Sequence, residues 1–172
     1  YYMPSAITVL SEDMKTKVEE QGAKKDKTFV VPAWFDVSTT REIPPEENKF
    51  IKKYSIPQDK FYVQFAGTIG YVFNYETVIE LAKRLKDIPD IVIQIIGDGA
   101  VKSEFVSKAE KLGLDNIVFY PLQPIELVPD VYSACNLCLI PLKKGVIGNG
   151  FPSKSAILMA CKRVIVNSVE ID

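Results

Sequence analysis

Short apolar runs recur along the chain at the spacing expected of strands in an α/β protein. They cover residues 61–66, 91–96, 117–120, 137–140 and 164–166. The run at 91–96 is broken only by Gln94, which is typical of a strand buried on both faces of a sheet. Helices are predicted between these runs, so the pattern indicates a doubly wound, mostly parallel sheet of the Rossmann-like α/β class.

The helices are predicted from apolar residues that recur at helical spacing. In the stretch 74–86, one stripe contains Tyr75, Val78, Ala82 and Leu85. Residues 100–112 repeat this pattern, and Gly113 is suited to end that helix. Shorter helices are predicted at residues 46–54, 127–134 and 153–160.

The first part of the chain predicts a smaller strand–helix–strand unit. Strands are expected at residues 6–10 and 28–32. The helix between them begins after Ser11, whose hydroxyl suits an N-cap, and ends at Gly22. Prolines make most of residues 36–60 a loop.

Two of the strands run directly into glycine-rich turns. The residues are Gly67, Thr68 and Gly70 after the first strand, and Gly97, Asp98 and Gly99 after the second. Ligands bind at the carboxyl ends of parallel strands, and glycine lets backbone N–H groups approach a phosphate. A phosphate-bearing ligand is therefore one interpretation. Ordinary tight turns, with Asp98 as an N-cap of the next helix, are the other.

A second candidate segment is the loop at residues 141–154, which follows a strand and precedes a helix. It contains three glycines, two prolines and three lysines. Ser153 would cap the helix, and Lys154 would add a positive charge beside exposed N–H groups, which favours an anion between them. A flexible surface loop is the alternative interpretation.

The composition excludes several classes of function. Of the 172 residues, 47% are hydrophobic and 25% charged, and a net charge of −1 gives no sign of a nucleic-acid partner. No apolar run is long enough to span a bilayer. The chain has no histidine, which removes Ser-His-Asp and Cys-His catalysis and most zinc chemistry from within it.

Three cysteines in a chain of this length indicate a reducing compartment, and therefore the cytoplasm. Cys135 and Cys138 form a C-x-x-C pair, but Cys138 falls within a predicted strand. Both are interpreted as packing residues rather than as metal ligands or redox groups. Since the chain starts at Tyr1 and stops at Asp172, just after a strand, we expect it to be a piece of a longer polypeptide.

Several segments, taken in order, resemble family-4 glycosyltransferases. They are residues 7–11, residues 30–36 (v-i-P-N-x-x-D, with Ala33 in place of asparagine), the glycine loop 65–70, residues 95–99 with 112–119 (G-d-G … l-g-l … N-V-x-F), and residues 151–154. The last segment, P-S-K, is similar to that of the branch that builds bacterial surface polysaccharides. The resemblance covers nearly the whole chain.

The resemblance implies a GT-B fold, in which two Rossmann-like domains face a cleft. Residues 1–172 would be the carboxyl-terminal, donor-binding domain, with the acceptor domain absent and no turnover by this chain alone. The donor would be a nucleotide-diphosphate sugar, most often UDP-linked, and transfer would retain the anomeric configuration with no metal or other cofactor. A glycan or lipid-linked acceptor would bind through the missing domain, and peripheral membrane association of the full-length protein stays open.

The resemblance also implies roles for individual residues, although it assigns no catalytic residue. The implied donor-binding residues are Gly67, Thr68, Gly70, Gly97, Asp98, Gly99, Leu122, Gln123, Asn149, Ser153 and Lys154. The first glycine loop would face the diphosphate, and the second would line the nucleoside pocket. The backbone of Leu122 and Gln123 would meet the base. Ser153 and Lys154 would stabilise the departing diphosphate.

The chain departs from the family pattern at three places. The paired glutamates, E-x7-E, fall at Asn149 and Ile157, and the basic residue after the glycine loop falls at Asn74. The A-x-G-x-P-V turn of the family corresponds to residues 160–165, which lack its glycine and its proline. A degenerate, non-catalytic GT-B domain with a structural or partner-binding role is therefore the alternative. A GT-B sugar epimerase is a third hypothesis, and it would need acid/base groups that the chain does not show.

Overall fold

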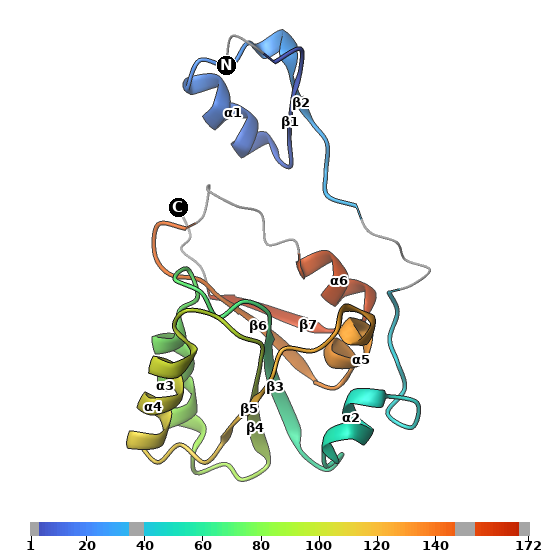
Figure 1. The fold of residues 1–172 in the computed structure, drawn as a ribbon, viewed down its shortest axis with the longest axis vertical. Helices are drawn as coiled ribbons and strands as arrows, with labels where there is room; N and C mark the ends of the chain where they lie inside the picture. The colour runs from blue at the N-terminus through green and yellow to red at the C-terminus, as the bar shows by residue number, and fades with distance from the viewer. Residues whose placement is uncertain (1–3, 35–39, 147–153, 169–172) are drawn as a thin grey trace.

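The computed structural model describes residues 4–34, 40–146 and 154–168, and its main unit is a five-stranded parallel sheet (Figure 1). The strand order is β5-β4-β3-β6-β7. The strands are β3 (Phe61–Ala66), β4 (Ile91–Ile96), β5 (Ile117–Tyr120), β6 (Leu137–Pro141) and β7 (Val164–Ser168). The predicted doubly wound, Rossmann-like α/β class is therefore confirmed, and every strand pair of this sheet is parallel.

Helices cover both faces of this sheet. They are α2 (Lys49–Tyr54), α3 (Tyr75–Leu85), α4 (Lys102–Lys111), α5 (Val128–Ser133) and α6 (Lys154–Ala160), with a 3-10 turn, η2 (Ile125–Leu127), before α5. Helices α3 and α4 pack on one face, and α2, α5 and α6 pack on the other. Within the described ranges, no helix combines the length and the apolar character needed to cross a membrane.

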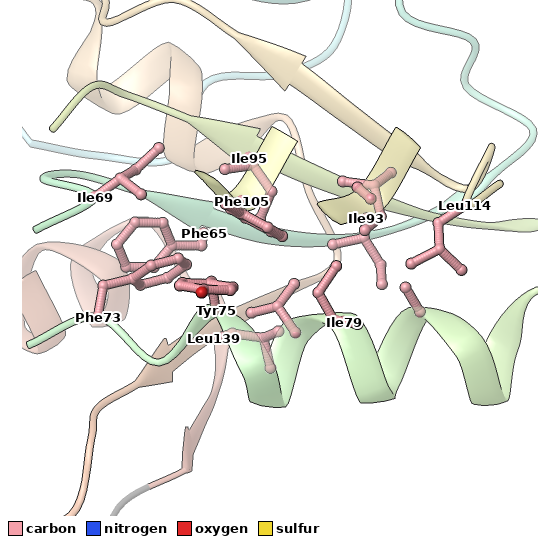
Figure 2. Close-up of a cluster of buried hydrophobic side chains, with 14 of the residues drawn as sticks. Phe65, Ile69, Phe73, Tyr75, Ile79, Ile93, Ile95, Phe105, Leu114 and Leu139 are labelled. Carbon is pink, nitrogen blue, oxygen red and sulfur yellow. The ribbon is translucent and has the colours of Figure 1, made fainter. Parts of the chain in front are cut away.

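The first face of the sheet is closed by an aromatic-rich core (Figure 2). Phe65 of β3 and Ile93 of β4 point toward α3 and α4. Phe105 of α4 has no exposed surface. The rings of Phe65 and Phe73 lie with centroids 4.2 Å apart. The stripe predicted for α3 is buried from Tyr75 to Ala82, so the helical period identified the correct face.

The second face is closed by a separate cluster of buried side chains. Phe50 of α2, Leu158 of α6 and all three cysteines are buried there. The cysteines are free thiols, and the Sγ atoms of Cys135 and Cys138 lie 3.3 Å apart. Their interpretation as packing residues is confirmed by this burial.

The first part of the chain forms its own two-stranded parallel sheet, which stands apart from the main sheet (Figure 1). Its elements are β1 (Ile7–Val9), α1 (Glu12–Glu20), η1 (Lys25–Lys27) and β2 (Thr28–Val30). Ser11 caps α1 as predicted, because its hydroxyl accepts a hydrogen bond of 3.3 Å from Met14 N. Phe29 and Trp34 are largely exposed on this unit.

Candidate functional site

The order of the main sheet reverses between β3 and β6. After β3 the chain adds β4 and β5 on one side, and it then returns to place β6 and β7 on the other. The ladder between β3 and β6 is registered only at Val63 and Gln64, well before β3 ends. The helices that follow these two strands pack on opposite faces. A crevice at such a switch point is the usual ligand position in open α/β sheets.

The two predicted glycine turns meet at this edge and are bonded to each other. Gly67 N donates to Ile96 O (2.9 Å), and Ile69 N donates to Asp98 O (2.8 Å). A Cβ on Gly97 would lie only 2.0 Å from Gly67 O, and one on Gly99 would lie 2.4 Å from Ile69 O. The second turn therefore needs glycine because the first turn packs against it, which is a different reason from ligand approach.

Lys154, the first residue of α6, reaches the first glycine turn from the other side of the switch point. Its Nζ donates to Ala66 O (3.0 Å) and lies 4.3 Å from the centre of the Phe65 ring. A Cβ on Gly67 would lie 2.6 Å from this Nζ. Burial lowers the pKa of Lys154 from its ordinary value of 10.5 to about 8. The fold thus brings together two residues predicted for the diphosphate, Gly67 and Lys154.

A second lysine lies at the same edge, next to the other glycine turn. Lys102, in the first turn of α4, donates from Nζ to Gly97 O over 2.7 Å. Its place in the sequence, directly after a glycine turn, is a signal that points to it.

A pocket opens beside Gly67, between the ends of β3 and β4 and the helix α5. Its cavity volume is about 90 Å³, and its lining residues are Ala66, Gly67, Ile96, Leu122, Gln123, Val128, Val131 and Tyr132. The side chains that line it are mainly apolar. Burial raises the pKa of Tyr132 to about 12, so its hydroxyl is neutral at physiological pH. Such a pocket can hold the flat face of a base while backbone groups bind its edge.

The pocket contains both residues predicted to meet a base. Leu122 is 66% exposed at the pocket mouth. The Gln123 side chain is turned toward α2, where its Nε2 donates to the Tyr54 hydroxyl (3.0 Å) and its Oε1 accepts from Lys53 Nζ (3.2 Å). The Gln123 side chain is therefore engaged away from the pocket, whereas Leu122 stays exposed to a ligand. Gly97 and Gly99 do not line this pocket, and their predicted role at the nucleoside stays a prediction.

The other predicted residues differ in where they lie. Thr68 and Asp98 are exposed at the same edge, and Gly70 O accepts a hydrogen bond from Phe73 N (3.0 Å). Asp98 as an N-cap of α4 is wrong: α4 begins after Val101, and the Asp98 carboxylate instead accepts from Gly99 N (2.8 Å). Asn149 and Ser153 lie outside the described residues.

The structure gives a physical account of the positions that depart from the family pattern. Asn74 caps α3, since its Oδ1 accepts from Thr77 N. Ile157 packs against the apolar core of the second face. Lys162, where the family has glycine, adopts a φ of 55°, a left-handed conformation that costs a non-glycine residue about 1 kcal/mol. An ion pair of 3.1 Å with Glu42 holds its side chain.

The sequence pointed to no residue of α5 as part of the site, although Val128, Val131 and Tyr132 line the pocket. Periodicity marked α5 as a helix, but the pocket forms only when the sheet places that helix beside Gly67. As for metals, the described part of the chain has no cluster of three or more Asp, Glu, His or Cys side chains that could hold one.

Comparison with known proteins agrees with this architecture. Residues 46–169 match the family described as Glycosyl transferases group 1. The chain is 26% identical over 155 residues to a protein of Escherichia coli (strain K12) named as a colanic acid biosynthesis glycosyl transferase, WcaI. This match covers 90% of the chain but 38% of that protein, so the chain spans about two fifths of its length.

Two solved structures share the fold. One is Anabaena Alr3699/HepE, solved in complex with UDP and glucose, with a TM-score of 0.74 and 18% identity over 95% of this chain and 44% of that one. The other is the C-terminal domain of a glycosyl transferase group 1 family protein (LpcC) from Francisella tularensis, with a TM-score of 0.60 and 19% identity over 78% of this chain and 70% of that one. The chain therefore belongs to the glycosyl transferases group 1 family, as a carboxyl-terminal domain of the GT-B fold.

Proposed function

We propose that this chain is the donor-binding half of a retaining glycosyltransferase that uses a nucleotide-diphosphate sugar, UDP-linked, in polysaccharide or glycan synthesis. The acceptor would bind to a separate domain. Two relatives support the proposal: one is named for colanic acid biosynthesis, and the other was solved with UDP and glucose. Cytoplasmic placement, at the inner face of a membrane when the acceptor is lipid-linked, stays a prediction.

One observation carries the proposal: the Lys154 ammonium group lies against the Gly67 turn, next to an apolar pocket. The ammonium is 3.0 Å from Ala66 O, and Ala66 and Gly67 also line the pocket. A base in the pocket and a diphosphate over Gly67 would thus occupy adjacent positions. The geometry accommodates a nucleoside diphosphate, which needs an apolar slot beside a positive charge.

The proposed chemistry requires a positive charge next to the donor bond that is cleaved. When the bond between the anomeric carbon and the diphosphate oxygen lengthens, negative charge accumulates on that oxygen. A fixed ammonium group stabilises this charge more in the transition state than in the bound donor, and this difference lowers the barrier. Thr68 and Asn74 carry no charge, and Lys102 contacts the other glycine turn at Gly97, so we assign the role to Lys154, whose Nζ lies against Ala66 and Gly67.

A second candidate function is a non-catalytic GT-B domain that binds a partner or has a structural role. The observation that favours it is Ile157, which packs into the apolar core where the family has the glutamate for the ribose hydroxyls. An isoleucine cannot accept hydrogen bonds from a ribose. Donor binding in this chain would then depend on Lys154 and the pocket alone, and direct titration distinguishes the two functions.

Titration with UDP, followed by amide NMR, is the experiment that tests the proposal. The expected result is a set of shifts confined to residues 66–70, 96–102, 122–123, 128–132 and the start of α6 at Lys154, with saturation below millimolar UDP. Uridine, which lacks the diphosphate, is the matched control and should shift only the pocket residues. The absence of any shift at millimolar UDP would exclude donor binding by this chain and favour the non-catalytic function.

The affinity for UDP is expected to fall as the pH rises through about 8, the pKa of Lys154. The protonated lysine is the form that attracts a diphosphate, and it is lost above this pKa. The terminal phosphate of UDP is already ionised above a pH of about 6. Calorimetry between pH 7 and 9 should show a loss of up to roughly tenfold per pH unit above the pKa.

The Lys154→Ala variant is the control for this pH dependence. It has no ammonium group at this place, so its weaker affinity should stay constant over the same range. A wild-type affinity that stays flat up to pH 9 would contradict the assignment of the lysine to the diphosphate.

A further inference from the structure

We propose that α5 is held in place by a clamp of buried hydrogen bonds, and that Gln64 of β3 is a positioning residue for the nucleotide pocket. This inference rests on the proposed function, because the pocket that α5 lines is the proposed donor site. The clamp is defined by the side chains of Asn48, Gln64, Gln94, Asp130 and Ser133. Among the described residues these are five of the six polar side chains that are buried.

Gln64 connects the middle of the sheet to α5. Its side chain has no exposed surface, and its Nε2 donates to Val131 O (2.9 Å) and to Gln94 Oε1 (3.1 Å). Gln64 and Gln94 are registered partners on β3 and β4, so their side chains lie next to each other on the same face. Ala66 and Ile96, two positions further along the same strands, line the pocket. The amide pair therefore lies one layer beneath the pocket.

The other contacts of the clamp come from the segment before and at the start of α2. Asn48 Nδ2 donates to Asp130 O (2.7 Å), and Asp130 Oδ1 accepts from Lys49 N (2.6 Å). Near the end of α5, Ser133 Oγ accepts from Ile43 N (2.9 Å). Successive residues of α5 are thus bonded to the sheet on one side and to residues 43–49 on the other.

A helix of this length needs such contacts to keep a defined position. Helix α5 has six residues and a proline in its first turn, so few hydrogen bonds form within it. Apolar packing has little directionality, whereas hydrogen bonds to Val131 O and Asp130 O determine where the helix sits along its axis. Val131 is itself a wall residue of the pocket, so a shift of α5 changes the pocket's shape.

One atom of the clamp indicates that it was not arranged for stability alone. Gln64 Oε1 is buried without a hydrogen-bond partner in the described part of the chain, whereas the Gln94 amide also faces the Tyr120 hydroxyl. Unpartnered buried polar atoms destabilise a fold, and an apolar pair of similar size avoids them. The gain that the amide pair offers over an apolar pair is the bond from Gln64 to Val131 O.

The test compares Gln64→Met with the double variant Gln64→Met/Gln94→Met. The single variant is expected to lower the midpoint of urea unfolding, weaken UDP binding roughly fivefold, and speed hydrogen exchange at the amides of residues 131–134. The double variant should recover most of the unfolding midpoint, since both partners become apolar, but neither the UDP affinity nor the protection of α5. Recovery of affinity together with stability would overturn the proposal.

Asn116→Ala is the matched control. Asn116 Nδ2 makes the same kind of bond, to Ala82 O (2.9 Å) of α3, on the face away from the pocket. This variant should lower stability but leave UDP affinity and α5 exchange unchanged. Failure of the proposed function would give a different result, because the wild-type protein would not bind UDP. Hydrogen exchange at the amides of residues 131–134 would still test whether Gln64 holds α5 in place. Unchanged exchange there in Gln64→Met would overturn it.

Discussion

Gly97→Ala is expected to lower the free energy of unfolding by about 4 kcal/mol or more, an exceptionally large effect for one methyl group. The new Cβ would lie 2.0 Å from Gly67 O and 3.0 Å from Gly67 C. Both are backbone atoms, and Gly67 N is already bonded to Ile96 O, so the first turn cannot move aside without losing that bond. The φ of Gly97, 140°, adds strain for any other residue. Urea unfolding followed by circular dichroism measures the loss.

Gly113→Ala separates the two causes. Gly113 also has a positive φ, 60°, but a Cβ there would meet nothing within 4 Å. Only conformational strain then lowers the free energy of unfolding, by about 1 kcal/mol. Equal losses at Gly97 and Gly113 would mean that contact between the two turns is not what requires glycine in this chain.

Lys154→Ala is expected to weaken UDP binding by about tenfold or more, the largest effect on binding that we predict. A charge-assisted hydrogen bond to a phosphate contributes about 1.5–3 kcal/mol. Neighbouring Thr68 and Asn74 cannot replace the lost charge. Isothermal titration of UDP at pH 7, where Lys154 is protonated, measures the change.

The control for this substitution is Lys111→Ala at the exposed end of α4, which removes the same charge far from the pocket. Its UDP affinity should equal that of the wild type. If Lys154→Ala also leaves the UDP affinity unchanged while lowering the stability, the role of the ammonium group is the structural hydrogen bond to Ala66 O and not the binding of a diphosphate.

The sheet and its helices could be predicted because local patterns determine them. The residues of β3, β4 and β5 agree with the predicted runs, and α3 begins after Asn74, whose side chain caps it. The family motifs also placed the glycine turns at the carboxyl ends of β3 and β4. Boundaries shifted where tertiary contacts decided them: α4 begins at Lys102 rather than at residue 100, because Val101 N bonds to Ile69 O of the other turn.

The candidate site was only partly predictable. The family resemblance assigned Gly67 and Lys154 to a diphosphate without placing one against the other, and their role toward a diphosphate stays a prediction; the contact between them comes from the structure. The sequence could not show why positions 97 and 99 require glycine. A glycine indicates that a Cβ would not fit, but it does not show which atoms a Cβ would meet. The pocket wall formed by α5 was missed because its residues carry no motif.

By itself, the sequence determined the order of strands and helices, the family, and the residue types at the ends of the strands. These depend on local periodicity, caps and motifs, which short stretches of chain contain in full. Only the tertiary structure decided that β6 returns beside β3, that Lys154 therefore lies over Gly67, and that Gln64 holds α5. Each of these contacts joins residues far apart in the chain, so it exists only after the sheet has assembled and the hydrophobic cores on both faces have formed.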